Sequence, residues 1–156
     1  MDAIIMPSTT SIISKLKNSY PDITFLPSDK FFWSSSEVTI YYDDKSDLLP
    51  VFLLHELSHA LLKHNNYEND IQLLTMERQA WDKAIELAGT FNINISNYIV
   101  QSNLDSYRDW LHARSTCPSC NAIGLQSREK SYICHSCGNS WRANEAKNCA
   151  LRRYNK

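Results

Sequence analysis

The stretch His55-Glu56-Leu57-Ser58-His59 lies inside an otherwise apolar run that extends from Val51 to Leu62. Residues at positions i and i+4 of a helix lie one above the other on one face, so the two histidines can reach a single zinc ion. The glutamate beside the first histidine can then act on a water molecule at that ion. The alternative is a buried helix whose histidines make ordinary hydrogen bonds, and Glu56 would then need a buried partner of its own.

A catalytic zinc ion usually has three protein ligands and one water, so a third ligand must come from elsewhere in the chain. The candidates downstream are His64, Glu68 and Glu77. His64 follows His59 by five residues and could reach the ion only if the helix ended first. Glu68 lies in a polar, loop-like stretch.

Glu77 is the polar residue in the apolar stripe of a second predicted helix, over residues 71–87. The apolar residues of this stripe recur three and four positions apart. A metal ion would explain a carboxylate that faces a packed pair of helices. The alternative is a glutamate at the helix edge, paired with Arg78 or Lys83. We favour Glu77 as the third ligand.

The His55–His59 pattern, followed by Glu77-Arg78-Gln79-Ala80-Trp81, resembles the gluzincin peptidases. The short gap between the two stretches resembles the ImmA/IrrE group of small intracellular metallopeptidases. This resemblance covers residues 10–112 and implies an α+β fold, with a short antiparallel sheet before the two metal-binding helices. It implies that His55, His59 and Glu77 bind one catalytic zinc ion and that Glu56 is the general base.

One position departs from the family pattern. Trp81 stands where the family has an Asp or Asn that supports a zinc-binding histidine, and the nearest substitute, Asp82, points to a different face. The resemblance also implies an antiparallel edge strand that holds an extended substrate. Upstream of the motif the sequence predicts a helix over 11–19, a strand over 23–26, and a hairpin of strands over 31–33 and 38–42. The strand over 38–42 is our candidate for the substrate-binding edge, and the alternative is an ordinary edge strand.

A peptidase of this kind also needs a donor that stabilises the oxyanion of the tetrahedral intermediate. The sequence predicts two short helices over 95–100 and 104–114 after the glutamate helix. They carry four candidate donors: Tyr98, Tyr107, His112 and Arg114. We favour Tyr98, although the sequence does not choose among them.

A second metal motif lies near the C-terminus. Cys117-Pro118-Ser119-Cys120 and Cys134-His135-Ser136-Cys137 form two Cys-x-x-Cys pairs separated by thirteen residues. Such spacing is typical of a structural zinc site and resembles a zinc ribbon. The alternative is two disulfide bonds. Cys149 remains as a free thiol, and His135 is a fallback ligand.

The sequence predicts two domains, a metallopeptidase-like domain over 1–112 and a ribbon over 113–156. The start of the chain lacks the pattern of a signal peptide, and no apolar run is long enough to span a membrane, so we expect a cytoplasmic protein. The ribbon segment carries eight Lys and Arg against two Asp and Glu, whereas residues 1–112 carry eight against fifteen. A basic ribbon with Tyr132, Trp141 and Tyr154 suits DNA or an acidic protein partner, and the alternative is a solvated basic tail.

These observations give three hypotheses. The first is an intracellular zinc metalloendopeptidase that acts on a protein or peptide, with a DNA-bound regulator as the leading substrate. The second is an SprT-like protease acting on DNA-associated proteins, a family whose third zinc ligand is a histidine. The third is a DNA-binding or regulatory protein with a degenerate zinc cleft that does not hydrolyse peptides.

Overall fold

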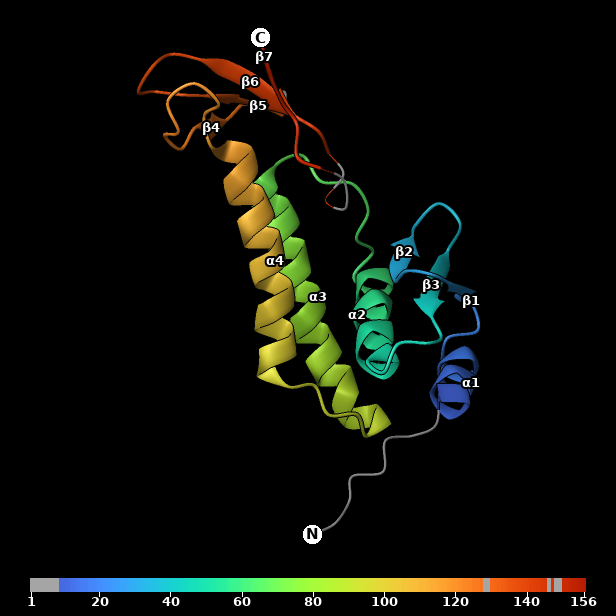
Figure 1. Ribbon diagram of the computed structural model, residues 1–156. Helices are drawn as coiled ribbons and strands as arrows, with labels where there is room; N and C mark the ends of the chain where they lie inside the picture. The colour runs from blue at the N-terminus through green and yellow to red at the C-terminus, as the bar shows by residue number, and fades with distance from the viewer. Residues whose placement is uncertain (1–8, 128–129, 146, 148–149) are drawn as a thin grey trace. The chain divides into compact units, whose positions relative to one another are not determined.

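The computed structural model describes residues 9–127, 130–145, 147 and 150–156, and it has a mixed α+β composition with helices and two sheets (Figure 1). The chain divides into two compact units. The first comprises Met1–Asn65 and Met76–Asn97, and the second comprises Asn66–Thr75 and Tyr98–Lys156. The division after residue 112 stays a prediction from the cysteine motif. Within the described ranges, no helix combines the length and apolar character needed to cross a membrane.

The first unit contains a three-stranded sheet in the order β1-β3-β2, formed by β1 (Thr24–Ser28), β2 (Phe32–Ser34) and β3 (Thr39–Asp43). β1 pairs with β3 in parallel, and β2 pairs with β3 antiparallel. The expectation that residues 38–42 form the substrate-binding edge is therefore wrong, because β3 is the central strand and has a partner on each side. The sheet is also mixed rather than purely antiparallel, because β1 runs parallel to β3.

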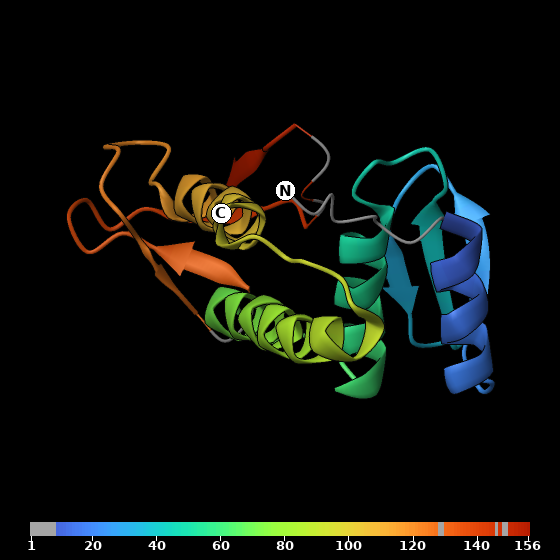
Figure 2. The same cartoon turned by 90° about the horizontal axis from the view of Figure 1, so that it is seen from below.

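The helix that carries the histidines, α2 (Leu49–Leu61), begins with Pro50 in its first turn, where the missing N–H of proline removes no helical hydrogen bond. It contacts β2 and β3, while α1 (Thr9–Ser19) contacts β1 and α2. On its other side α2 meets α3 (Asp70–Phe91), where the rings of Phe52 and Trp81 lie 5.9 Å apart. The helix thus lies between the sheet and α3 (Figures 1 and 2). Most of its residues are buried, as expected from the apolar run around the motif.

The end of α2 is defined by backbone geometry. Lys63 has a positive φ of 55°. Its N–H donates to Ala60 O at 3.1 Å, and the N–H of His64 donates to His59 O at 2.9 Å. This pattern is a left-handed helix cap, in which the chain turns back over the last helical turn. The turn brings His64 next to the end of the helix that carries His59.

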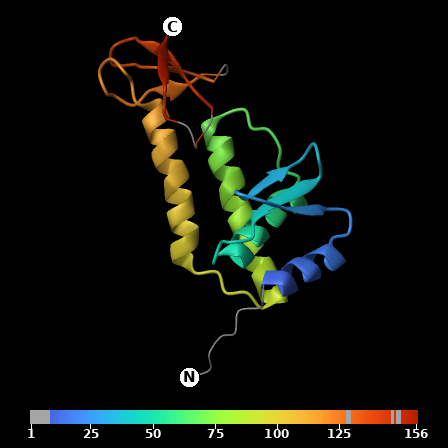
Figure 3. The same ribbon diagram turned by 45° about the vertical axis from the view of Figure 1, so that its right-hand side comes forward.

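In the second unit, α4 (Asn97–Ser115) is one continuous helix, so the prediction of two short helices is wrong. The four strands β4 (Leu125–Gln126), β5 (Ser131–Ile133), β6 (Ser140–Ala143) and β7 (Arg153–Asn155) form an antiparallel sheet in sequence order. Figure 3 shows this sheet at the C-terminal end of α4.

The core of the second unit is built around two aromatic rings. Tyr132 and Trp141 are almost completely buried and stack with their centroids 5.5 Å apart. Trp141 Nε1 donates to Arg114 O at 2.9 Å, and Arg114 Nε donates to the Tyr132 hydroxyl at 3.2 Å. The Tyr132 hydroxyl donates in turn to the carboxylate of Asp70. These contacts join the sheet to the end of α4 and to the first turn of α3.

A substitution at Gly124 tests the packing around Trp141. A Cβ at Gly124 would lie 2.4 Å from Cη2 of Trp141, whereas a Cβ at Gly89 in α3 would meet nothing within 4 Å. We expect Gly124→Ala to lower the free energy of unfolding by ~1–3 kcal/mol, the usual cost of overpacking. We expect the matched Gly89→Ala to leave it unchanged or raise it by ~0.5–1 kcal/mol, because alanine is the better helix former. Guanidinium denaturation measures both variants, and equal stabilities would contradict the packing described for Trp141.

Candidate metal centres

Three buried side chains of the first unit bring their donor atoms together. His55 Nε2 lies 3.1 Å from Glu77 Oε2 and 3.2 Å from His59 Nε2. His59 Nε2 lies 3.5 Å from Glu77 Oε1. The histidines come from α2 and the glutamate from α3, as the two-helix motif predicts. We refer to His55, His59 and Glu77 as the ligand triad.

The spacing of the triad fits a metal ion. Nitrogen and oxygen ligands placed about 2.0–2.1 Å from zinc at tetrahedral angles lie about 3.3 Å from one another. The two histidine nitrogens lie 3.2 Å apart, close to that value, and the two oxygens of Glu77 lie 3.1 Å from His55 Nε2 and 3.5 Å from His59 Nε2 respectively. Two imidazole nitrogens and a carboxylate form a donor set that zinc accepts. The triad is therefore a candidate metal-binding group.

The pKa shifts within the triad follow from this crowding. Burial alone would raise the pKa of Glu77, but hydrogen bonding to His55 and His59 outweighs burial and holds that pKa well below its usual range. Burial alone would lower the pKa of His59, whereas the carboxylates of Glu77 and Glu56 raise it. Glu77 is thus an anion, which is the form that binds a cation.

Glu56 lies beside the triad but is not one of its three converging donors. Its side chain is buried, and burial raises the pKa of its carboxyl group above the ordinary value, although nearby His55 and His59 oppose this shift. A hydrogen bond from the backbone of Trp33 in β2 also favours the ionised form. A buried carboxylate of raised pKa is well suited to accept a proton.

Two other side chains support the histidines of the triad. His59 Nδ1 lies 2.9 Å from Nδ1 of His64. The ring of His55 stacks on Trp81, with centroids 4.2 Å apart and an interplanar angle of 24°. The sequence did not identify the contact of His64 with His59, because it depends on the turn at Lys63. A sign in the sequence that the helix ends soon after His59 would have indicated this contact.

The second candidate metal centre lies in the ribbon. Cys117 and Cys137 have their Sγ atoms 3.7 Å apart, and Cys120 and Cys134 have theirs 3.5 Å apart. Thiolates bound to zinc at about 2.3 Å in a tetrahedron lie about 3.8 Å from one another. The four cysteines are free rather than paired in disulfides. Burial alone would raise the pKa of Cys117, but backbone N–H groups of Cys120 and Ser119 outweigh it and lower that pKa to about 6.

The remaining predicted residues lie elsewhere. Tyr98 is 81 % exposed at the start of α4 and belongs to the second unit, so its role as an oxyanion donor stays a prediction. Glu68 is exposed and also belongs to the second unit. Arg114 is fully buried and forms part of the core. Cys149 lies outside the described residues.

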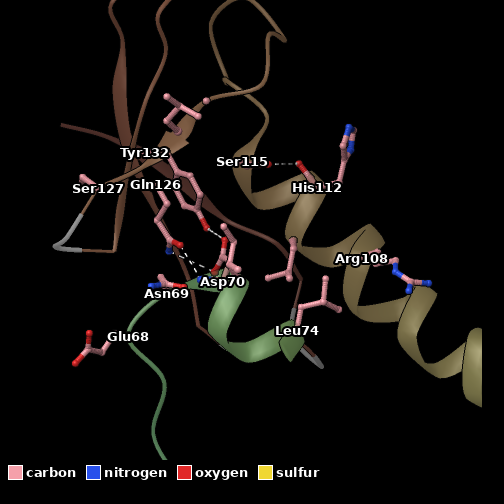
Figure 4. Close-up of a pocket in the computed structure, with 14 residues that line it drawn as sticks. Glu68, Asn69, Asp70, Leu74, Arg108, His112, Ser115, Gln126, Ser127 and Tyr132 are labelled. Atoms are coloured by element: carbon pink, nitrogen blue, oxygen red, sulfur yellow. Dashed lines mark hydrogen bonds between the residues drawn. The ribbon is translucent and has the colours of Figure 1, made fainter. Parts of the chain in front are cut away.

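The second unit also contains a pocket of about 940 Å³, lined by the start of α3, one face of α4 and the β4 strand (Figure 4). Part of its polar wall makes hydrogen bonds within the fold. Gln126 Nε2 donates to Asp70 Oδ1 at 3.3 Å, and the backbone N–H of Asp70 donates to Gln126 Oε1 at 2.7 Å. The Tyr132 hydroxyl contacts the same carboxylate. These three side chains therefore hydrogen-bond to one another, whereas the triad brings three converging donor atoms together.

No protein-family model, curated protein or solved structure matches the chain.

The triad makes a direct prediction about metal content. We expect the chain to bind two zinc ions and Glu77→Ala to bind one, because the variant removes the anionic donor and leaves the ribbon intact. The matched control is Glu68→Ala, which we expect to keep both ions. Mass spectrometry under non-denaturing conditions measures the count, and two ions in Glu77→Ala would remove this residue from the site.

The ribbon makes a separate prediction. Trp141 is buried in one cluster with Cys117 and Cys134, so loss of a structural metal should expose its ring. We expect a strong chelator to shift tryptophan emission to longer wavelength, and we expect this shift to be smaller in Trp141→Phe. An equal shift in both proteins would mean that the cysteine cluster does not hold the ribbon together through a metal.

Proposed function

We propose that the chain is a zinc-dependent metallopeptidase with a gluzincin-like core, similar to the ImmA/IrrE group. The convergence of His55, His59 and Glu77 beside the buried Glu56 carries this proposal. The resemblance of the two helical stretches to the gluzincin pattern supports it. The carboxylate of Glu77 lies beside the nitrogens of His55 and His59 and could serve as third ligand, which favours the gluzincin interpretation over an SprT-like one, whose third ligand is a histidine.

The proposed mechanism gives separate roles to the triad, to Glu56 and to Tyr98. The triad would hold a zinc ion, which supplies electrophilic polarisation of the scissile carbonyl and makes a nearby water more acidic. Glu56 accepts a proton from the attacking water, and its raised pKa suits this step. The same carboxyl group then delivers the proton to the departing amine. Tyr98 remains our proposed donor to the oxyanion.

The substrate is best placed along β2. Since β3 is central, the sheet presents β1 and β2 at its edges, and the backbone of Trp33 in β2 hydrogen-bonds to Glu56. An extended peptide that pairs with a strand edge gains main-chain hydrogen bonds whatever its sequence. The proposed substrate-binding edge is therefore Phe32–Ser34 rather than residues 38–42.

The ribbon is the proposed targeting element, for a protein substrate such as a DNA-bound regulator or for DNA itself. Two of the three aromatic residues that suggested a DNA or acidic-protein partner, Tyr132 and Trp141, are buried. Arg114 is also buried, 3.8 Å from the Asp70 carboxylate. The surface that remains for such a partner includes Arg142 and Tyr154, which are opposite one another on β6 and β7. A regulatory protein without hydrolytic activity remains the alternative proposal.

Glu56→Gln separates hydrolysis from metal binding. We expect this variant to keep two zinc ions and to lose peptide hydrolysis by a factor of ~10²–10⁴, the usual contribution of a general base. The matched control is Glu86→Gln, an exposed glutamate of α3 paired with Lys83. Mass spectrometry of new amino termini in a mixture of unstructured peptides measures cleavage. Undiminished cleavage by Glu56→Gln would remove Glu56 from the mechanism, and no cleavage by the unmodified protein would favour the regulatory alternative.

A further inference from the structure

We infer that His64 is a positioning residue for His59, and that a chain of hydrogen bonds from His59 through His64 to Gln79 fixes which nitrogen of His59 faces the metal. This inference rests on the metal site proposed above and deepens it. It assigns a role to two residues, His64 and Gln79, that the two-helix motif does not include.

The contacts form an unbroken path. His59 Nδ1 lies 2.9 Å from His64 Nδ1, and His64 Nε2 lies 3.3 Å from the amide oxygen of Gln79. Gln79 belongs to α3 and follows Glu77 by two residues, so the path returns to the helix that supplies the third ligand. His64 therefore makes one contact through each of its ring nitrogens, and His59 contacts His64 through the nitrogen that does not face the triad.

The direction of every proton in this path follows from its two ends. A metal at His59 Nε2 requires the lone pair of that nitrogen, so the proton of the neutral ring must sit on Nδ1. His59 Nδ1–H then donates to His64 Nδ1, which must accept. The proton of neutral His64 is consequently on Nε2, where it faces an oxygen that can only accept. The proton position that Gln79 requires on His64 therefore agrees with the proton position that a metal requires on His59.

The backbone holds His64 in place for this contact. The left-handed turn at Lys63 directs the chain back, and the N–H of His64 donates to His59 O at 2.9 Å. On the other side, Nε1 of Trp33 in β2 donates to His64 O at 3.0 Å. Two hydrogen bonds to the main chain of one residue restrict the positions that its side chain can take.

The departure at Trp81 concerns the other histidine of the triad, because Trp81 stacks on His55. A carboxylate usually accepts the second N–H of a metal-binding histidine and sets its tautomer and its orientation. Beside His59, the neutral imidazole of His64 takes the place of that carboxylate. His55 is oriented differently: its Nδ1 is buried without a hydrogen-bond partner among the described residues, and its ring stacks on Trp81. The two ligands are thus held by two different kinds of contact.

Metal affinity tests the inference. Cobalt titration distinguishes the two centres, because thiolate ligands give intense charge-transfer bands that a site of histidine and glutamate lacks. We expect His64→Ala to weaken cobalt binding at the triad by ~10–100-fold, the usual effect of removing such a partner. We expect His64→Gln to recover most of that loss, since its amide oxygen can accept the His59 proton. The matched control is His112→Ala, an exposed histidine of α4.

Nitrogen-15 spectra of the zinc-loaded protein give a readout that a merely structural role would not move. We expect His64 in the tautomer protonated on Nε2 and His59 protonated on Nδ1. Unchanged cobalt affinity in His64→Ala, or a His64 protonated on Nδ1, would overturn the inference while leaving the metal site itself intact. A wild-type protein that binds metal only through its cysteines would overturn the proposed function, and it would do so without any comparison of variants.

Discussion

The first unit depends on a carboxylate and two imidazoles that share one small buried volume. Glu77 is an anion held between His55 and His59 at 3.1 and 3.5 Å, and an uncompensated charge at this depth would be costly. Because the ligands come from α2 and α3, this demand fixes how the two helices face each other. The apolar residues around them supply the packing, whereas the polar triad specifies the register between the helices.

The sequence identified this triad because helical spacing and burial are both local properties. The i, i+4 histidines and one carboxylate inside an apolar stripe need no knowledge of distant contacts. The same is true of the cysteine pairs. Partners along a sheet are not local, and the central position of β3 therefore escaped prediction. The contact of His64 also escaped, since it requires a left-handed residue at Lys63, a conformation that lysine seldom adopts.

The ribbon shows how composition alone can mislead. In the sequence, Tyr132 and Trp141 suggest a surface that binds a partner, yet both are core residues whose polar atoms make hydrogen bonds within the fold. Arg114 contributes to the basic count of its segment but lies 3.8 Å from the Asp70 carboxylate and 3.9 Å from that of Glu145. Its guanidinium also covers the ring of Trp110 at 4.4 Å. A charge that is used to build the fold is not available to attract a partner.

Trp33 connects the sheet to two parts of the site at once. Its backbone hydrogen-bonds to Glu56, and its indole donates to the main chain of His64 at 3.0 Å. Strand β2, the proposed peptide-binding edge, thus contacts both Glu56, the proposed proton acceptor, and the segment beside His59, a proposed metal ligand. Any displacement of this strand would act on both groups together, so under the proposed function the binding of a peptide at β2 would also affect the alignment of the reactive groups.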